Sequence, residues 1–138
     1  MPQRPVELIL ARQLASGLAV PVLLVDARGD TLFFNESAEP IFGRRFDELD
    51  ELSLERRTEV MRPRDGQGEP LPVDDLPGMT AMRERQPAHV GFYIDSYDGH
   101  RRAVEATAIP LESAGGHVLG AFIVLWASPE RDGPPEAP

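Results

Sequence analysis

The sequence predicts an α+β domain built on one antiparallel sheet, with its helices gathered on one face. Its 138 residues have the length of one ordinary domain with a single core. Short apolar or alternating segments near both ends of the chain predict strands, and charged segments with helical spacing lie between them. The expected order is helix, two strands, several short helices and three strands.

The first expected element is an amphipathic helix over residues 6–18, which ends near Gly17. Its apolar residues recur at a spacing of four and are Val6, Leu10, Leu14 and Leu18, with Ile9 beside them. A helix with such a stripe must bury it, either on the outer face of the sheet or against another chain.

A hairpin is expected next. Residues 20–26 form a β-branched apolar run, typical of a strand buried on both faces, and residues 31–35 are its expected partner. In the turn between them, Asp26 can accept a backbone hydrogen bond and Gly29 can supply a positive φ. Asn35 then suits the N-cap of a very short helix that begins at Glu36 and stops at Gly43.

The middle of the chain predicts short helices and a loop. Residues 46–62 place apolar side chains among many charges, as in one or two surface helices, and the Gly- and Pro-rich residues 62–72 predict a loop. We expect Asp74 or Asp75 to cap the following helix, with Pro77 in its first turn.

Three strands are expected to close the domain. In residues 88–96, Val90, Phe92 and Ile94 alternate with the opposite-facing His89, Gly91, Tyr93 and Asp95. A turn at Asp98 and Gly99 leads to residues 101–111, and a turn at residues 114–117 leads to residues 118–126. The Pro-rich residues 128–138 are expected to be a disordered tail, so the predicted division is 1–18, 19–127 and 128–138.

Composition removes several classes of function. Without cysteine the chain has no thiolate metal site, cysteine nucleophile or cofactor attached through sulfur. The net charge of −9 disfavours a nucleic-acid partner, because phosphate binding relies on Lys and Arg. No apolar run is long enough to cross a membrane and no export signal is evident, so a cytoplasmic location without membrane attachment is expected.

Together these segments resemble a PAS domain. The similarity lies in DARGDTLFFNESAEPIFG, in LPVDDLPGMTAM and in DGHRRAVEATAIPLESAGGHVLGAFIVLW, and it extends over residues 20–126. It implies a five-stranded sheet in the order 2-1-5-4-3, with short helices forming a pocket over it. It also implies a non-enzymatic sensory role, in which a small molecule or a partner protein is bound and the change is passed on.

The resemblance and the residue pattern together predict where a ligand would lie. Small sheet residues facing longer helix side chains leave room for close packing or for a cavity that suits an apolar molecule. The expected pocket residues are Phe42, Leu71, Met79, Met82, Phe92, Ile94, Val104, Ala106, Ala108, Ala121 and Ile123. Arg83 or Arg85 is a candidate partner for a ligand carboxylate. The cofactor, if any, stays unknown, and noncovalent flavin remains open.

Three alternatives remain open. His89 could ligate the iron of a haem in a gas or redox sensor, although its strand position also fits an outward-facing histidine. Asp74 and Asp75 could do acid–base work in a small pocket enzyme. The domain could also bind no ligand and serve as a protein-interaction module.

A homodimer is the expected assembly, because PAS domains commonly dimerise through such a helix. Its expected interface joins the helix to the outer sheet surface and contains Val6, Ile9, Leu10, Leu14, Tyr93, Phe122, Val124 and Trp126. Exchange of this dimer for a complex with a larger signalling protein in trans would be a route for the signal.

Overall fold

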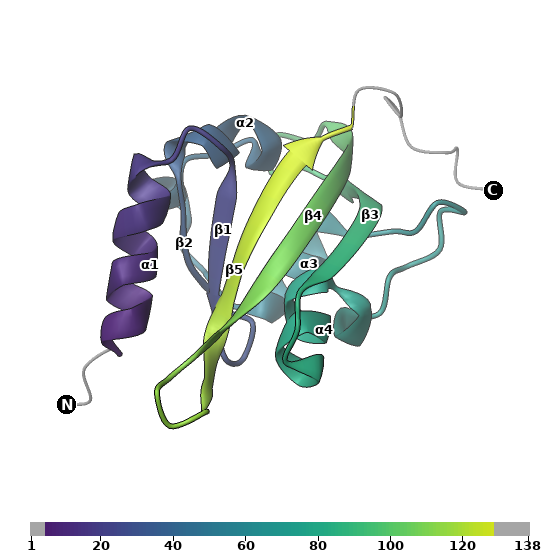
Figure 1. The fold of residues 1–138 in the computed structure, drawn as a ribbon. Helices are drawn as coiled ribbons and strands as arrows, with labels where there is room; N and C mark the ends of the chain where they lie inside the picture. The colour runs from purple at the N-terminus through teal and green to yellow at the C-terminus, as the bar shows by residue number, and fades with distance from the viewer. Residues whose placement is uncertain (1–4, 129–138) are drawn as a thin grey trace.

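A computed structural model describes residues 5–128, so the predicted tail over residues 128–138 lies outside the described part of the chain except for Ser128. Five strands form one antiparallel sheet in the order β2-β1-β5-β4-β3, as predicted (Figure 1). The strands are β1 (Val22–Asp26), β2 (Thr31–Phe34), β3 (Ala88–Asp95), β4 (Arg101–Glu112) and β5 (Val118–Ala127).

The helices lie on both sides of this sheet. The 12-residue helix α1 (Val6–Gly17) runs along the side of β1 and β2, while α3 (Leu54–Met61) and α4 (Pro77–Glu84) lie behind the strands (Figure 1). The remaining helices are very short: η1 (Glu36–Ala38), α2 (Glu39–Phe42), η2 (Phe46–Glu48) and η3 (Val73–Asp75). None of the helices in residues 5–128 is long and apolar enough to cross a membrane.

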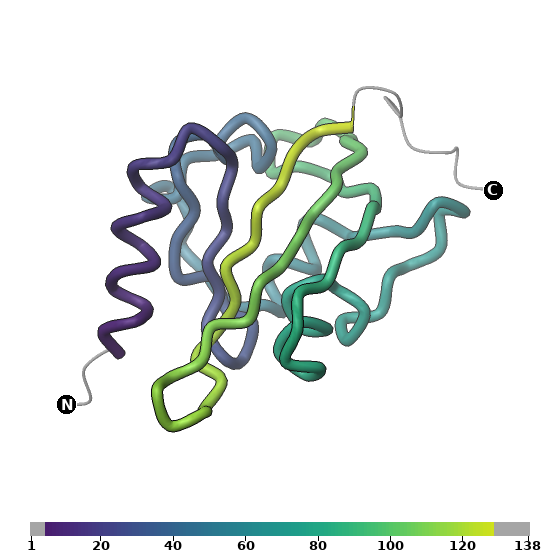
Figure 2. Tube along the Cα trace, viewed as in Figure 1, coloured from purple at the N-terminus to yellow at the C-terminus, as the bar shows by residue number. Residues whose placement is uncertain are grey.

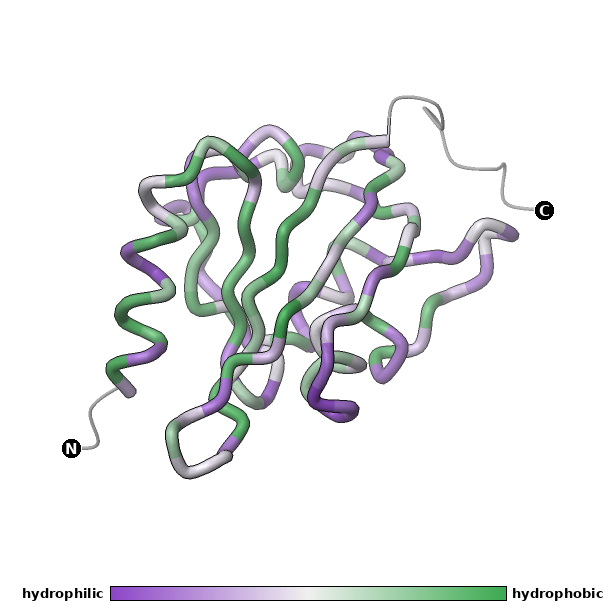
Figure 3. The backbone as a smooth tube through the Cα atoms, viewed as in Figure 1, coloured by the Kyte–Doolittle hydropathy of each residue, from purple (hydrophilic) through white to green (hydrophobic). Residues whose placement is uncertain are grey.

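The alternation of side chains in the strands produces two separate apolar clusters. On the face that we call inner, β-strand residues such as Ile94, Val104 and Ile123 pack with Phe42 and Met82 of the short helices. On the outer face, α1 packs its own cluster against the sheet, and its members are Leu8, Ala11, Ala15, Val22, Leu24 and Phe122. In Figure 3 the central strands β1 and β5 are largely apolar, as expected for strands covered on both faces.

Local chemistry explains the first hairpin. The Asp26 carboxylate accepts hydrogen bonds from the backbone N–H groups of Arg28 and Asp30, at 2.9 and 3.0 Å, and Gly29 has a φ of 91°. Gly43 ends α2 in the left-handed conformation, where a Cβ would lie 2.6 Å from the Asp98 carboxyl carbon. These turn and cap predictions are confirmed.

The predicted cap of α4 is wrong. Leu76 occupies the N-cap position and no side chain caps the helix, although Pro77 is in the first turn as expected. Asp74 and Asp75 belong instead to η3 and are exposed. The loop between α3 and η3, over residues 62–72, reaches out beyond the β3 edge of the sheet (Figure 2).

Candidate functional site

A cavity of about 60 Å³ lies between the inner face of the sheet and the helices α3 and α4. Strands β1, β3, β4 and β5 form its floor, and the turn after β1 closes one end. Its lining consists of Leu23, Val25, Gly29, Phe42, Arg57, Thr58, Met61, Pro63, Leu76, Pro77, Gly78, Met79, Phe92, Ile94, Val104, Ala106, Ile123 and Leu125. The walls are almost entirely apolar, so the cavity suits an apolar molecule or apolar group.

Two glycines set how closely the walls approach one another. A Cβ at Gly78 would lie 3.0 Å from Cδ1 of Ile123, so this glycine lets α4 come close to β5. A Cβ at Gly29 would lie 2.8 Å from the sulfur of Met79, so the β1–β2 turn presses against the same helix. The four residues of these two contacts, Gly78, Ile123, Gly29 and Met79, all line the cavity.

Arg57 carries the only charge among the described residues that line the cavity. It projects from α3, and its Nη1 donates a hydrogen bond of 2.7 Å to Oγ1 of Thr31 on β2, a hydroxyl that is itself buried. Burial lowers the pKa of the Arg57 guanidinium to about 10, although nearby Tyr97, Asp30 and Asp26 act to raise it. The group stays charged at neutral pH.

Strand β1 joins this cavity to α1. Leu23 and Val25 face the cavity, while the alternating residues Val22 and Leu24 belong to the cluster under α1. A single strand therefore contacts the cavity on one face and the N-terminal helix on the other.

Asn35 makes a second connection to α1. Its Nδ2 donates to the carbonyls of Ala15 and Val20, at 2.9 and 2.8 Å, and its Oδ1 accepts from the N–H groups of Val22 and Ala38, at 3.0 and 3.1 Å. Only 1% of the residue is exposed. The end of α1, the start of β1 and the start of η1 thus meet at one buried amide.

Comparison with solved structures identifies this arrangement. A PAS domain from Colwellia psychrerythraea superposes with a TM-score of 0.63 at 13% identity, covering 90% of this chain and 98% of its own. The PAS domain of BvgS from Bordetella pertussis gives 0.59 at 21% identity, covering 91% of this chain and 88% of its own. The chain has a PAS fold. No protein-family model matches its sequence, and no curated protein matches it either.

A third solved structure with a similar fold contains a ligand. VqmA bound to DPO superposes with a TM-score of 0.57 at 12% identity, covering 87% of this chain and 57% of its own. At sequence identities this low, the comparisons show a shared fold but do not show a shared function.

The residues expected to form the pocket of this PAS fold divide into two groups. Seven line the cavity, and they are Phe42, Met79, Phe92, Ile94, Val104, Ala106 and Ile123. Four lie in or against the packed inner cluster outside the lining, and they are Leu71, Met82, Ala108 and Ala121. Met82, Ala108 and Ala121 are buried in the packed cluster, whereas Leu71 is only partly buried against it.

His89 lies on the outer face of the PAS sheet, on the far side from the cavity. Its Nδ1 is 2.7 Å from Oγ1 of Thr107 and its Nε2 is 2.8 Å from Oε1 of Glu105, while its ring lies near that of Trp126. The sheet separates the imidazole from the pocket, so this geometry contradicts the alternative in which His89 ligates a haem there.

The other predicted polar candidates also lie away from the cavity. Asp74 and Asp75 are exposed, and neither is in the lining. Arg83 donates to the backbone carbonyl of Asp74 at 2.8 Å, and Arg85 donates to that of Gly116. Arg57, which sequence reasoning missed, takes the place that had been expected for Arg83 or Arg85.

The signal for Arg57 is present in the helix spacing. Arg57 follows Leu54 by three residues and precedes Met61 by four, so it belongs to the apolar side of α3. The neighbouring Arg56 is exposed and pairs with Glu59.

The predicted interface residues differ in exposure. The side of α1 away from the sheet leaves Val6, Ile9, Leu10 and Leu14 between 46% and 60% exposed, and Trp126 is 42% exposed. Val124 is partly buried, whereas Phe122 lies under α1 and Tyr93 is only 8% exposed. The outer surface available to a partner is therefore the exposed stripe of α1 and the end of β5.

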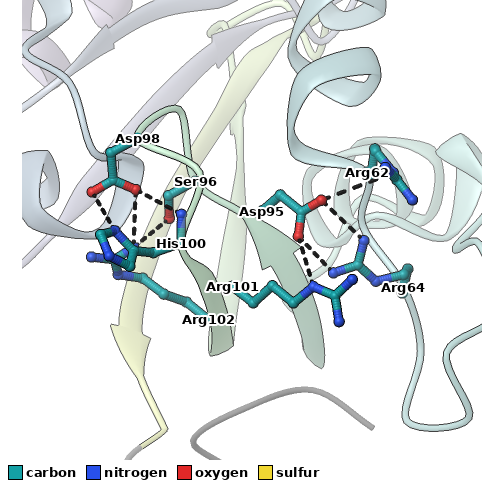
Figure 4. Close-up of polar contacts among 8 residues, drawn as sticks. All are labelled: Arg62, Arg64, Asp95, Ser96, Asp98, His100, Arg101 and Arg102. Atoms are coloured by element: carbon teal, nitrogen blue, oxygen red, sulfur yellow. Dashed lines mark hydrogen bonds and ion pairs between the residues drawn. The ribbon is translucent and has the colours of Figure 1, made fainter. Parts of the chain in front are cut away.

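A polar cluster fixes the β3–β4 hairpin at one end of the sheet (Figure 4). The Asp95 carboxylate accepts a 2.9 Å hydrogen bond from Nη2 of Arg64 and lies within ion-pair distance of Arg62 and Arg101. The hydrogen bond from Arg64 is the main cause that lowers the pKa of Asp95, and the surrounding arginines act in the same direction. This cluster ties the loop after α3 to the sheet.

Beyond Asp95, the hairpin also contacts α2. The buried Ser96 hydroxyl donates to the carbonyl of Ile41, and the Tyr97 N–H donates to that of Phe42 at 2.7 Å. Since Phe42 lines the cavity, the hairpin holds one of its walls in place.

Proposed function

We propose that this chain is a sensory module that takes up a small, largely apolar molecule in the inner cavity and passes the change on through α1. The observation that carries the proposal is the double role of β1, whose alternate residues face the cavity and the helix. If a ligand at Leu23 or Val25 moves the β1 backbone, Val22 and Leu24 move with it, because these residues alternate along one strand. VqmA, which is similar in fold over 57% of its own length, has been solved bound to DPO, and this supports only the ligand-binding part of the proposal.

The proposed output surface is the exposed stripe of α1, and its proposed occupant is a second copy of this chain. Four apolar side chains of one helix point away from their own sheet. One of the four, Ile9, also lines a groove of about 340 Å³ between α1 and the hairpin, together with Leu8, Arg12, Leu24 and Leu32. In the proposed two-fold dimer, the exposed stripe of one copy lies against the groove of the other, and the same contact is made twice. Exchange of one copy for a larger signalling protein would transmit the state of the cavity.

We further propose that the module has no catalytic activity of its own. The acid–base pair considered for an enzyme, Asp74 and Asp75, is exposed and separate from the cavity. The cytoplasmic location expected from the sequence stays a prediction.

A ligand-free interaction module is the second candidate, and the small size of the cavity favours it. A volume of about 60 Å³ holds a few water molecules or a small organic fragment, and the flexible Met61 and Met79 could fill part of it.

Native mass spectrometry of the purified protein, compared with its denatured mass and its absorption spectrum, tests the proposal. A retained small mass supports the sensory function, and the spectrum then distinguishes flavin or haem from a colourless metabolite. A bare native mass that no small molecule changes supports the ligand-free module instead. The same spectra report the proportion of dimer.

A further inference from the structure

The position of Arg57 defines the chemistry of the ligand more narrowly, and the inference drawn from it rests on the proposed sensory function. The cavity has one charged group, at the α3 end, while its other walls are aliphatic or aromatic. A ligand that satisfies both parts needs an anionic end and an apolar end.

The guanidinium of Arg57 has spare hydrogen-bonding capacity. An arginine side chain carries five N–H donors, and the Thr31 hydroxyl is the acceptor that Arg57 uses within residues 5–128. In that part of the chain, no carboxylate lies within 4.0 Å of its nitrogens, whereas Arg64 pairs with Asp95 at 2.9 Å. The structure therefore leaves a charged donor group at the cavity without a charged partner.

The acidic residues near Arg57 have other partners. Oδ1 of Asp30 accepts the N–H of Leu54 at 2.8 Å, and its Oδ2 lies 3.4 Å from Arg28. Oδ1 of Asp26 accepts two backbone N–H groups of the hairpin turn. Tyr97, followed by these two carboxylates, raises the pKa of Arg57 from a distance, and within residues 5–128 none of the three is hydrogen-bonded to its guanidinium.

We propose that the cavity binds a small monocarboxylate, whose carboxylate accepts hydrogen bonds from Arg57 and whose apolar part lies against Phe92, Val104 and Ala106. Two parallel N–H donors match the two oxygens of a carboxylate. A second negative charge on the ligand would lie among apolar walls, which disfavours dicarboxylates. The volume of about 60 Å³ selects a short chain.

Isothermal titration calorimetry with matched pairs of ligands tests the proposal. The probes are straight and branched monocarboxylates of three to eight carbons, each compared with its own neutral amide at pH 7. We expect the best acid to bind at least roughly tenfold more tightly than its amide, since hydrogen bonds to charged groups are about twice as strong as neutral ones.

Substitution of Arg57 tests whether its guanidinium causes the preference for the acid over the amide. Arg57→Gln is expected to remove this preference for the acid while leaving the affinity for the amide nearly unchanged, which also shows that the cavity is still folded. Arg56→Gln is the matched control, because Arg56 is the exposed neighbour on the same helix, and it should keep the preference. Arg57→Lys keeps the charge and loses the planar pair of donors, so an intermediate affinity is expected.

Failure of the carboxylate assignment can be distinguished from failure of the proposed sensory function. Equal binding of acids and amides, or a preference that survives in Arg57→Gln, would overturn the assignment of a carboxylate and leave the sensory function in place. If no acid or amide binds and the native mass is that of the bare protein, the ligand-binding function fails together with the inference.

Discussion

The side-chain nitrogen of Asn35 donates a 2.9 Å hydrogen bond to the carbonyl of Ala15 and so links the end of β2 to the last turn of α1. The two residues are 20 positions apart in the chain. The same amide also caps η1 through Ala38, so one residue joins the N-terminal helix to the region that carries the cavity. This link is the physical basis for treating α1 as part of the domain.

Asn35→Ala should lower the free energy of unfolding by about 2–4 kcal/mol, because it leaves several buried backbone groups without partners. Urea unfolding followed by circular dichroism measures the loss. Hydrogen exchange should show α1 opening more than β3. Ser53→Ala is the control, since Ser53 caps only α3, and its removal should cost about 1 kcal/mol without loosening α1. A stable Asn35→Ala variant with a protected α1 would contradict the assigned role.

Leu10→Glu should dissociate the proposed homodimer and leave the monomer folded. Leu10 is 56% exposed, so the change costs the monomer at most about 0.5 kcal/mol, whereas a carboxylate in an apolar interface should weaken dimerisation roughly 100-fold. Sedimentation velocity over a range of protein concentrations measures the effect. Gln67→Glu adds a negative charge to the exposed loop after α3 and should leave the dimer intact. A monomeric wild-type protein at high micromolar concentration would refute the dimer.

Asp95→Asn should destabilise the domain by about 1–2 kcal/mol at pH 7, because it removes a charged hydrogen-bond acceptor from the Arg64 pair. The pKa of Asp95 is lowered in the folded state, so its stabilising contribution is present above the usual aspartate pKa near 4 and is lost as the pH falls below that value. The wild type and the variant should therefore converge in stability at low pH. Urea midpoints measured from pH 7 to pH 2.5 test this, with Glu59→Gln in the exposed Arg56 pair as the control.

Gly29→Ala should destabilise the domain more than Gly99→Ala does. The two glycines have φ values of 91° and 89°, so the backbone strain of a new Cβ is nearly the same, of order 1–2 kcal/mol. Only at Gly29 would the Cβ meet Met79 and Leu54, at 2.8 and 3.0 Å, whereas at Gly99 it would lie in open space. We expect about 1 kcal/mol of additional loss from this contact, measured by thermal unfolding. Equal losses would mean that the turn does not press on the cavity wall.

Short-range patterns predicted much of the fold and part of the site. The alternation in β3 placed Phe92 and Ile94 at the cavity and His89 on the opposite face, because successive side chains in a strand point to opposite sides. Asn35 was predicted as an N-cap from its residue type. Its hydrogen bonds to Ala15 and Val20 were not predicted, because these partners lie 20 and 15 positions earlier in the chain.

Packing decides where the local pattern left two outcomes open, as in α1, or pointed to the wrong residue, as at the start of α4. Helix α1 has apolar residues on two sides, and Leu8, Ala11 and Ala15 pack on the sheet, where the two alanines allow a close approach. The stripe with the more regular spacing, which includes Leu10 and Leu14, is left exposed. Asp74 and Asp75 have the residue type of a helix cap, yet the chain turns into α4 one residue later, at Leu76.

The sequence by itself determined the order of the elements, the turns and the sheet faces, because those depend on neighbours within a few positions of each residue. Only the tertiary structure decided that Arg57 reaches the cavity, that β1 connects the cavity to α1, and which face of α1 is free. These features depend on contacts between residues that are far apart in the chain, such as Arg57 with Thr31 and α1 with Phe122. The helix spacing places Arg57 on the apolar side of α3, but its contact with Thr31 and the packing of α1 on Phe122 follow from the shapes of packed surfaces.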